Sequence, residues 1–273
     1  MTESWFTFPV IDPVAFAIGP LAIRWYALAY MAGLLCGWQI LRHLAKRPGA
    51  IMQPVQVDQL LNYIIIGVIV GGRLGYVVFY QPLLYWQDPM AVWRVWEGGM
   101  AFHGGFLGVV VAVFLFARRH HIPLLRLSDH VGLVAPLGLL FGRLANFING
   151  ELFGRITTHP IGMVFPTGGP LPRHPSQLYE AGLEGLLLGV IFALCWRAGL
   201  SQKQPGSFIA LFLIGYGLAR FVVEFFREPD AHIGLYEWGG VALSQGQLLS
   251  LPMILIGGAL LVYLPRNHGT RKA

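Results

Sequence analysis

Three arginines lie inside otherwise apolar stretches of the chain, where a charge is unexpected. Arg143 belongs to G-R-L-A-N-F-I-N-G-E-L-F-G-R at residues 142–155, which closes an apolar run beginning near Val131. Arg73 and Arg220 hold similar positions in two other apolar runs. A charge at bilayer depth is costly, so such residues generally mark a binding site or an ion pair. A planar guanidinium group binds phosphate oxygens bidentately, which makes a phosphate group a fitting ligand for clustered arginines.

Other polar side chains accompany these arginines at helical spacing. Asn146 lies three residues after Arg143, so the two share one face of a helix. Tyr216, Arg220 and Glu224 recur at every fourth residue and form a polar stripe on an apolar helix. We therefore take these side chains as candidate ligand-binding residues.

His103 and Tyr26 are two further candidates. His103 stands between apolar residues and glycines in M-A-F-H-G-G-F-L-G. Its ordinary pKa of about 6.5 suits a proton acceptor at neutral pH. The alternative is that this lone histidine is only hydrogen-bonded to a neighbouring helix. Tyr26 lies near the start of the first apolar run.

The alternative to a ligand site is a network of arginines and glutamates that locks the helices together. Arg220 and Glu224 can pair within one helix, and Glu151, Glu180 and Glu184 are further partners within the sequence. We favour the ligand site because a tyrosine, an asparagine and a histidine accompany the arginines, which mutual ion pairing does not require.

The elements that carry these residues are predicted to be membrane helices. The chain of 273 residues is 55% hydrophobic and 12% charged, with a mean hydropathy of +0.60. This composition excludes an ordinary soluble domain and is typical of a polytopic, all-α integral membrane protein. No linker divides the sequence, so we predict one domain over residues 1–273. The first 20 residues contain no lysine or arginine, so we expect no removable signal peptide.

Seven apolar runs approach the roughly 20 residues that cross a bilayer. We predict spans at residues 21–41, 60–80, 98–117, 131–149, 178–196, 207–226 and 247–264. Basic residues such as Arg118 and Arg119 gather in alternate loops, and acids gather in the others. The positive-inside rule then places the N-terminus outside and the C-terminus in the cytoplasm. The broken stretch Gln81–Trp96 is expected to lie along the outer interface.

In this topology the candidate side chains share one depth. Arg73, Arg143 and Arg220 each lie six or seven residues below the outer end of a span. At about 1.5 Å per residue, that is on the order of 10 Å inside the membrane. Tyr26 and His103 enter from the same side. We therefore expect five helices to bring polar groups to one level in the outer leaflet.

Small and capping residues are expected to shape the helices near Arg143. Gly142, Ala145 and Gly150 provide small surfaces where neighbouring helices can approach closely. Ser176 is expected to cap the fifth span, in a segment that is otherwise an ordinary proline-containing helix start.

Several other chemistries are not indicated. The H-G-G string at residues 103–105 is not followed by G-x-S-x-G, so a hydrolase is excluded. The sequence contains no H-E-x-x-H, P-loop or EF-hand loop, and we expect no metal and no other cofactor. Cys36 and Cys195 lie in apolar segments and form no C-x-x-C motif. The basic residues follow the predicted topology, so no nucleic-acid partner is expected.

The stretch at residues 142–155 resembles the signature of bacterial prolipoprotein diacylglyceryl transferases. The resemblance continues through I-D-P at 11–13, R-W-Y at 24–26, G-G-R-L-G-Y at 71–76, G-G-M-A-F-H-G-G at 98–105, R-H-P-S-Q-L-Y-E at 173–180 and G-Y-G-L-A-R-F-V-V-E-F-F-R-E-P-D at 215–230. This chain departs from the family at Ala145, where glycine is common, and at Arg24, where histidine is frequent. Its loop at 155–172 is also shorter than in some members.

The resemblance implies a transfer reaction. The sn-1,2-diacylglyceryl group of phosphatidylglycerol passes to the thiol of a lipobox cysteine in a preprolipoprotein, a thioether forms and glycerol phosphate leaves. The family's functional residues correspond here to Tyr26, His103, Arg143, Asn146, Gly154, Tyr216, Arg220 and Glu224.

Roles for these residues follow from the implied reaction. We expect His103 to be the base, and Arg143 and Arg220 to stabilise the departing phosphate. Removal of the thiol proton with help from the arginines is the alternative. Arg73 is a secondary candidate for binding phosphatidylglycerol, and a structural role is its alternative. Gly154 is expected to let the backbone approach a headgroup.

The resemblance also implies a location and partners. The protein is expected in the bacterial cytoplasmic (inner) membrane, with the site facing the outer leaflet, and its partners are phosphatidylglycerol, lipobox peptides and membrane lipid. One alternative function is a transporter that binds phosphate or phospholipid in transit, although no convincing repeat relates the two halves. A third interpretation treats the polar residues purely as contacts between helices.

Overall fold

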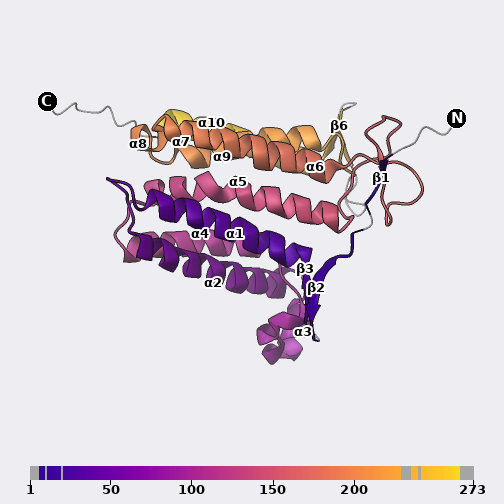
Figure 1. Cartoon of the computed structure of the whole chain (residues 1–273), viewed down its shortest axis with the longest axis horizontal. Coiled ribbons are helices and arrows are strands. Elements are labelled where there is room, and N and C mark those ends of the chain that lie inside the picture. Colours follow the sequence, from indigo (N-terminus) through magenta and orange to yellow (C-terminus); the bar gives the residue numbers. More distant parts are fainter. Residues whose placement is uncertain (1–5, 10, 20, 229–234, 239–240, 265–273) are drawn as a thin grey trace. The chain divides into compact units, whose positions relative to one another are not determined.

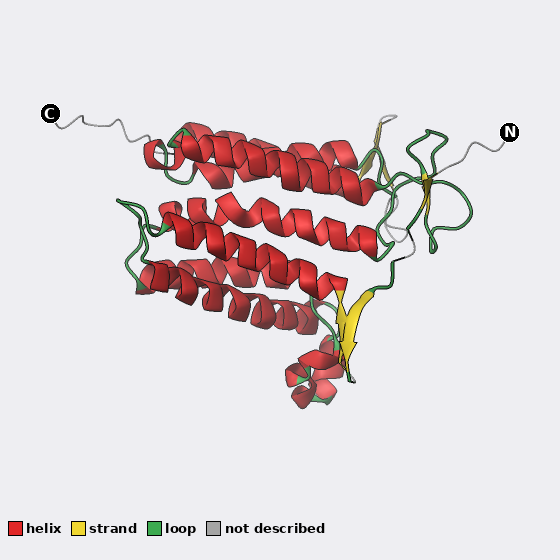
Figure 2. Cartoon of the chain, viewed as in Figure 1, coloured by secondary structure: helices red, strands yellow, loops and turns green. Residues whose placement is uncertain are grey.

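Helices make up most of the chain (Figure 2). The structure, a computed structural model, describes residues 6–9, 11–19, 21–228, 235–238 and 241–264. The chain divides into two compact units. The large unit consists of residues 1–37 and 129–273, and the small unit consists of residues 38–128.

The large unit contains the helices that carry Arg143 and Arg220. It includes α1 (Trp25–Leu44) as far as Gly37 and α5 (Leu124–Ile148) from Asp129 onward. The later elements are α6 (Ser176–Glu180), a π-helical stretch (Ala181–Leu187), α7 (Leu188–Arg197), α8 (Leu200–Lys203), α9 (Ser207–Val223) and α10 (Gln245–Tyr263). α9 and α10 run side by side (Figure 1).

Close packing in the large unit fixes the helices around the two arginines. The rings of Phe192 on α7 and Phe208 on α9 are fully buried, with centroids 5.2 Å apart. The carboxylate of Asp129 on α5 accepts a hydrogen bond of 3.0 Å from the backbone N–H of Phe208, which caps the start of α9. Gly185 of the π-helical stretch packs on Leu140 of α5, where an added Cβ would lie 2.7 Å from the Cα of Leu140.

The small unit is built on a tight helix pair. α2 (Pro54–Phe79) packs along α4 (Phe102–Arg119), and the two run side by side in Figure 1. Glycines line the contact, because a Cβ added at Gly75 would lie 2.8 Å from the Cα of Gly104. Such small residues allow two helix backbones to approach closely. In the sequence, α2 and α4 are connected by α3 (Pro82–Gln87) and two short 3₁₀ helices (Pro89–Trp93 and Val95–Glu97).

Three two-stranded sheets accompany the helices of the large unit. β1 (Phe6–Thr7) pairs in parallel with β4 (Met163–Val164). β2 (Val14–Ile18) pairs with β3 (Leu21–Arg24), and β5 (Leu235–Trp238) pairs with β6 (Val241–Ser244), both antiparallel. The all-α prediction omitted these strands, because runs of two to five residues are too short to show a clear alternation of apolar residues.

Five helices are long and apolar enough to cross a membrane. They are Pro54–Phe79, Phe102–Arg119, Leu124–Ile148, Ser176–Arg197 and Gln245–Tyr263. α9 is apolar but has 17 residues, which makes it shorter than these five helices. α1 has 20 residues but is not one of the five. These lengths agree with a helical membrane protein. The number of seven spans, the interfacial position of residues 81–96 and the single domain over residues 1–273 stay predictions.

Several predicted boundaries are wrong. Residues 21–24 form a strand, so the first helix begins at Trp25. The third span was predicted from residue 98, but α4 begins at Phe102 after two glycines with positive φ. The span predicted at 207–226 ends as α9 at Val223, because the following residues turn toward the polar contacts described below.

Two predictions about single residues are also wrong. Pro175 holds the N-cap position of α6, whereas Ser176 is its first helical residue and donates a hydrogen bond of 3.0 Å to the carbonyl oxygen of Leu152. Gly142 does not mark a close helix contact, because a Cβ added there meets no atom within 4 Å. Gly150 has a φ of +63° and serves the turn that follows α5.

Candidate active site

Arginines and glutamates of the large unit form one connected group of ion pairs, which we call the charged centre. Its members are Arg143 on α5, Glu180 on α6, Glu184 in the π-helical stretch, Arg220 on α9, and Glu224 and Arg227 in the turn after α9. The group therefore joins residues from distant parts of the sequence.

Glu180 is shared by the two arginines that the sequence singles out. Nε of Arg143 lies 3.0 Å from one carboxylate oxygen of Glu180, and Nη1 of Arg220 donates to the other at 2.9 Å. The Glu180 side chain is fully buried. A buried carboxylate is stable only when it is paired and hydrogen-bonded. Glu180 therefore brings α5 and α9 to the same point, as the predicted convergence of Arg143 and Arg220 requires.

Glu184 lies one turn further along and, within the described part of the chain, forms its ion pair with Arg143. Nη2 of Arg143 donates to Oε2 of Glu184 at 3.4 Å. Among the described residues Oε1 of Glu184 has no hydrogen-bond partner, although the side chain is fully buried. Glu184 lies within the π-helical stretch, and π-bulges inside α-helices occur frequently at functional sites.

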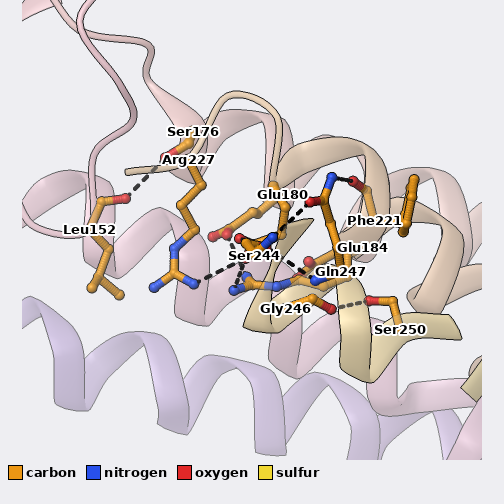
Figure 3. Close-up of polar contacts among 12 residues, drawn as sticks. Leu152, Ser176, Glu180, Glu184, Phe221, Arg227, Ser244, Gly246, Gln247 and Ser250 are labelled. Carbon is orange, nitrogen blue, oxygen red and sulfur yellow. Dashed lines mark hydrogen bonds and ion pairs between the residues drawn. The ribbon is translucent and has the colours of Figure 1, made fainter. Parts of the chain in front are cut away.

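Figure 3 shows Glu180 and Arg227 of the charged centre near Ser244 and Gly246 at the start of α10. Glu224 closes the charged centre on this side. Its carboxylate pairs closely with Arg220 and lies 3.3 Å from Nη1 of Arg227. The hydroxyl of Ser244 donates to Oε2 of Glu224 at 2.7 Å. Gly246 leaves room for this carboxylate, because an added Cβ would lie 2.6 Å from Cδ of Glu224.

The charged centre balances in formal charge, with three arginines and three glutamates. The ion-pair network that the structural interpretation requires is therefore present.

The centre also keeps a donor for a ligand. The Arg143 side chain retains 18% of its surface, and its Nη1 atom forms no hydrogen bond or ion pair with the described residues. A guanidinium with a free, accessible N–H is suited to a phosphate oxygen.

Three other predicted site residues lie in the large unit. Nδ2 of the buried Asn146 donates to the carboxylate of Glu151 at 3.0 Å rather than to a neighbour of Arg143. The hydroxyl of Tyr26 lies 3.3 Å from that of Tyr30. Tyr216 lies on α9 one turn before Arg220, and its ring stacks on that of Phe212 with the centroids 5.4 Å apart. Its predicted part in binding phosphatidylglycerol stays a prediction.

Gly154 has a packing role in the structure. Its N–H donates to the carbonyl oxygen of His174 at 2.8 Å, and an added Cβ would lie 2.8 Å from the Cβ of His174. The N–H of the next residue, Arg155, donates to the carbonyl oxygen of Phe226 at 2.8 Å. Glycine at position 154 thus joins the loop after α5 to the turn that carries Arg227. Its predicted approach to a headgroup stays a prediction.

His103 and Arg73 lie in the small unit. His103 is the second residue of α4, is exposed, and has its ring 5.8 Å from that of Phe102. Arg73 is 4% exposed and is enclosed by backbone carbonyl groups. The prediction that these two residues meet Arg143 and Arg220 at one level stays a prediction.

The sequence did not single out Ser244 and Gly246 as neighbours of the charged centre. One signal was present, because S-Q-G-Q at residues 244–247 is a capping box. The structure contains this box, with the N–H of Gln247 donating to the Ser244 hydroxyl at 3.2 Å. The pattern indicates the start of α10 but contains nothing to indicate that the same hydroxyl reaches Glu224.

Comparisons with known proteins show which family the sequence matches. The sequence profile of the family described as prolipoprotein diacylglyceryl transferase matches residues 13–263. A protein of Paramagnetospirillum magneticum is 52% identical over 261 residues, covering 95% of this chain and 96% of that protein. A protein of Rhodospirillum rubrum is 57% identical over 252 residues, covering 92% and 91%. Both are named phosphatidylglycerol–prolipoprotein diacylglyceryl transferase.

Proposed function

The chain belongs to the prolipoprotein diacylglyceryl transferase family, and on that premise we propose that the charged centre is the site of its reaction. The protein is an integral membrane transferase that moves the diacylglyceryl group of phosphatidylglycerol to a prolipoprotein. The acceptor is the thiol of a lipobox cysteine. The transporter alternative is not favoured, since the matching relatives are named as transferases.

The reaction exchanges one bond for another. The thiolate of the substrate peptide attacks the terminal glyceryl carbon of the lipid, a carbon–sulfur bond forms, and the bond from that carbon to the phosphate oxygen breaks. The bond's electron pair leaves with glycerol phosphate. Because the peptide supplies the nucleophile, neither Cys36 nor Cys195 is needed for the chemistry.

The observation that carries this proposal is that Arg143 and Arg220 meet on one buried carboxylate. Negative charge grows on the phosphate as the carbon–oxygen bond breaks, and preorganised donors at that point lower the barrier. The Nη1 of Arg143, which no described residue uses, is such a donor. The phosphatidylglycerol site around the arginines is proposed to include Tyr26, Asn146, Gly154, Tyr216 and Glu224. The proposed reaction uses no cofactor.

Removal of the thiol proton requires a base or a strong cationic field, because a free thiol has a pKa of about 8.5. We assign the base to His103, which is exposed at the start of α4. Deprotonation assisted by the arginines is the alternative. The site is proposed to face the outer leaflet of the bacterial inner membrane, with the N-terminus outside and the C-terminus in the cytoplasm. Nucleic acid is not a proposed partner.

A purified-protein assay tests the proposal directly. Wild-type protein in phosphatidylglycerol micelles with a lipobox peptide should form the thioether, detected by mass spectrometry. Arg143→Ala should lower the rate by about 100-fold or more, since one preorganised donor is lost. Arg42→Ala is the matched control, because the Arg42 side chain is 40% exposed, pairs with Asp58 and lies over the ring of Trp38 in the other unit of the chain. Full activity of Arg143→Ala, or liposome flux without thioether, would contradict the proposal.

A further inference from the structure

Arg73 is held in an unusual way for a buried arginine. Its guanidinium donates five hydrogen bonds to backbone carbonyl oxygens, which we call the carbonyl cage. The acceptors are Ala91 (2.5 Å), Val92 (2.9 Å), Arg94 (3.1 Å), Gly98 and Gly99 (3.1 Å). The ring of Tyr85 covers the guanidinium, with Cζ 5.2 Å from the ring centroid. All three guanidinium nitrogens are therefore occupied by one short segment, residues 91–99.

The cage leaves Arg73 poorly suited to bind a phosphate. A phosphate oxygen would have to displace carbonyl groups, and each carbonyl group left without a donor away from water is unfavourable. Every hydrogen-bond acceptor of the Arg73 guanidinium among the described residues is a neutral carbonyl, so no carboxylate there holds the cation ready for exchange with another anion. Arg143 differs, because an Nη1 donor of that residue is not used by the described residues.

The segment needs an external donor because it lacks a regular hydrogen-bond ladder. It consists of two 3₁₀ turns followed by Gly98 and Gly99, whose φ values are +87° and +79°. Carbonyl groups removed from water need donors, and here one guanidinium serves five that are partly or fully buried. A Cβ at position 99 would lie 2.7 Å from Nη1 of Arg73, so glycine is needed for both backbone conformation and space.

The cage lies directly before the start of α4. The N–H of Ala101 donates to the carbonyl oxygen of Gly72 at 2.9 Å, and the N–H of Gly105 donates to Ala101 at 3.0 Å, which begins the helix. His103 lies between these two points. Arg73 and Gly72 are adjacent on α2, so this single turn of α2 holds the chain on the N-terminal side of His103.

We infer that Arg73 is a positioning residue, which fixes residues 91–99 on α2 and thereby sets the place of His103. The inference rests on the proposed function for its activity readout. It replaces the expectation that Arg73 binds phosphatidylglycerol. Loss of a residue that binds the lipid raises KM, whereas loss of a positioning residue lowers kcat, so kinetics can distinguish the two roles.

A double-mutant cycle tests this inference. We expect Arg73→Met to lower kcat about tenfold to 100-fold with KM for phosphatidylglycerol changed less than about twofold, because transition-state geometry and not ground-state binding is lost. Arg73→Met combined with His103→Gln should be about as active as His103→Gln alone, since both changes act through one group. Additive losses, or full activity of His103→Gln, would overturn the link to His103.

Hydrogen exchange supplies a readout that does not depend on catalysis. Amides of residues 94–103 should exchange about tenfold faster or more in Arg73→Met, because five carbonyl groups of the segment lose their shared donor. Arg73→Lys serves where the methionine variant fails to fold, and it should give intermediate exchange because an ammonium has three donors. Arg118→Met, an exposed arginine at the far end of α4, is the matched control.

The outcomes separate the inference from the proposed function. Unchanged exchange in both Arg73 variants, together with a tenfold rise in KM for phosphatidylglycerol, would show that Arg73 binds the lipid and overturn the inference. A wild-type protein that forms no thioether would contradict the proposed function, whereas faster exchange in Arg73→Met would still support the positioning of residues 91–99.

Discussion

The two units of this protein bury arginines in opposite ways. In the small unit the Arg73 guanidinium is enclosed by neutral carbonyl groups of one nearby segment. In the large unit Arg143 and Arg220 are neutralised by carboxylates from other helices, and Glu180 serves both. A carbonyl cage uses all the donors and fixes the backbone. A carboxylate network holds charge that a competing anion can displace, so we expect it to be the region that reacts.

The largest effect is expected from removing the shared carboxylate of the charged centre. Glu180→Ala should lower the free energy of unfolding by about 3–5 kcal/mol, because two cations lose a buried partner. Denaturant unfolding in detergent measures this change. Glu228→Ala is the matched control, since Glu228 pairs with Arg173 but its side chain is 50% exposed, and its loss should cost less than about 1 kcal/mol. Equal losses would remove the distinction between the buried network and a surface pair.

Replacing arginine by lysine should separate the two environments by activity. In Arg220→Lys we expect the rate of thioether formation to fall about 100-fold, because a point charge cannot pair with Glu180 and Glu224 and still serve a phosphate. In Arg73→Lys we expect a loss of about tenfold or less, since the ammonium keeps some hydrogen bonds to the cage. Initial rates at saturating lipid give both values. A larger loss at Arg73 would contradict the comparison.

Two glycines provide a matched test of packing. Gly99→Ala should destabilise the protein by about 1–3 kcal/mol, because its positive φ disfavours a side chain and the cage has no room for one. Gly142→Ala should be neutral or stabilising by up to about 1 kcal/mol, since that position is helical and open. The midpoint temperatures of thermal unfolding of the two variants measure both changes in stability. A stable Gly99→Ala variant would mean that the cage tolerates distortion.

The smallest effect is expected from protonation of His174, in the loop beside the charged centre. Burial, with a smaller contribution from His159, lowers the pKa of His174 below its usual value. The folded state therefore favours the neutral imidazole, whose stabilising contribution is complete above about pH 6.5 and is lost as the pH falls through the lowered pKa. As the pH is lowered from 7.5 to about 5, the midpoint temperature of thermal unfolding should fall less steeply in His174→Gln than in wild type. His43→Gln, an exposed histidine of the small unit, is the control, and an equal change in both variants would contradict the expectation.

Local pattern was enough to single out the buried arginines Arg143 and Arg220 but not their partners. The apolar runs around Arg143 and Arg220 show that each cation lies within a helix, and helical spacing places Tyr216 beside Arg220. Spacing along one helix contains no record of which neighbouring helix it faces. For that reason Glu180 was one of several possible partners in the sequence, and only packing made it the residue that both arginines share.

The carbonyl cage was beyond the reach of sequence reasoning for a related cause. Carbonyl groups occur in every residue, so no residue type marks the acceptors of Arg73. The glycines at 98 and 99 and the broken helical pattern of residues 81–96 were visible signals, yet they indicate an irregular segment and not its anchor. The π-helical stretch at Ala181–Leu187 was likewise missed, because its sequence has ordinary helical composition.

By itself the sequence determined that this is a helical membrane protein with arginines inside its apolar runs, since hydropathy and charge are properties of the residues themselves. The tertiary structure alone decided how each guanidinium is neutralised. That outcome depends on which helix faces and backbone segments come within about 3 Å of one another, and hydrogen bonds and ion pairs form only at that range.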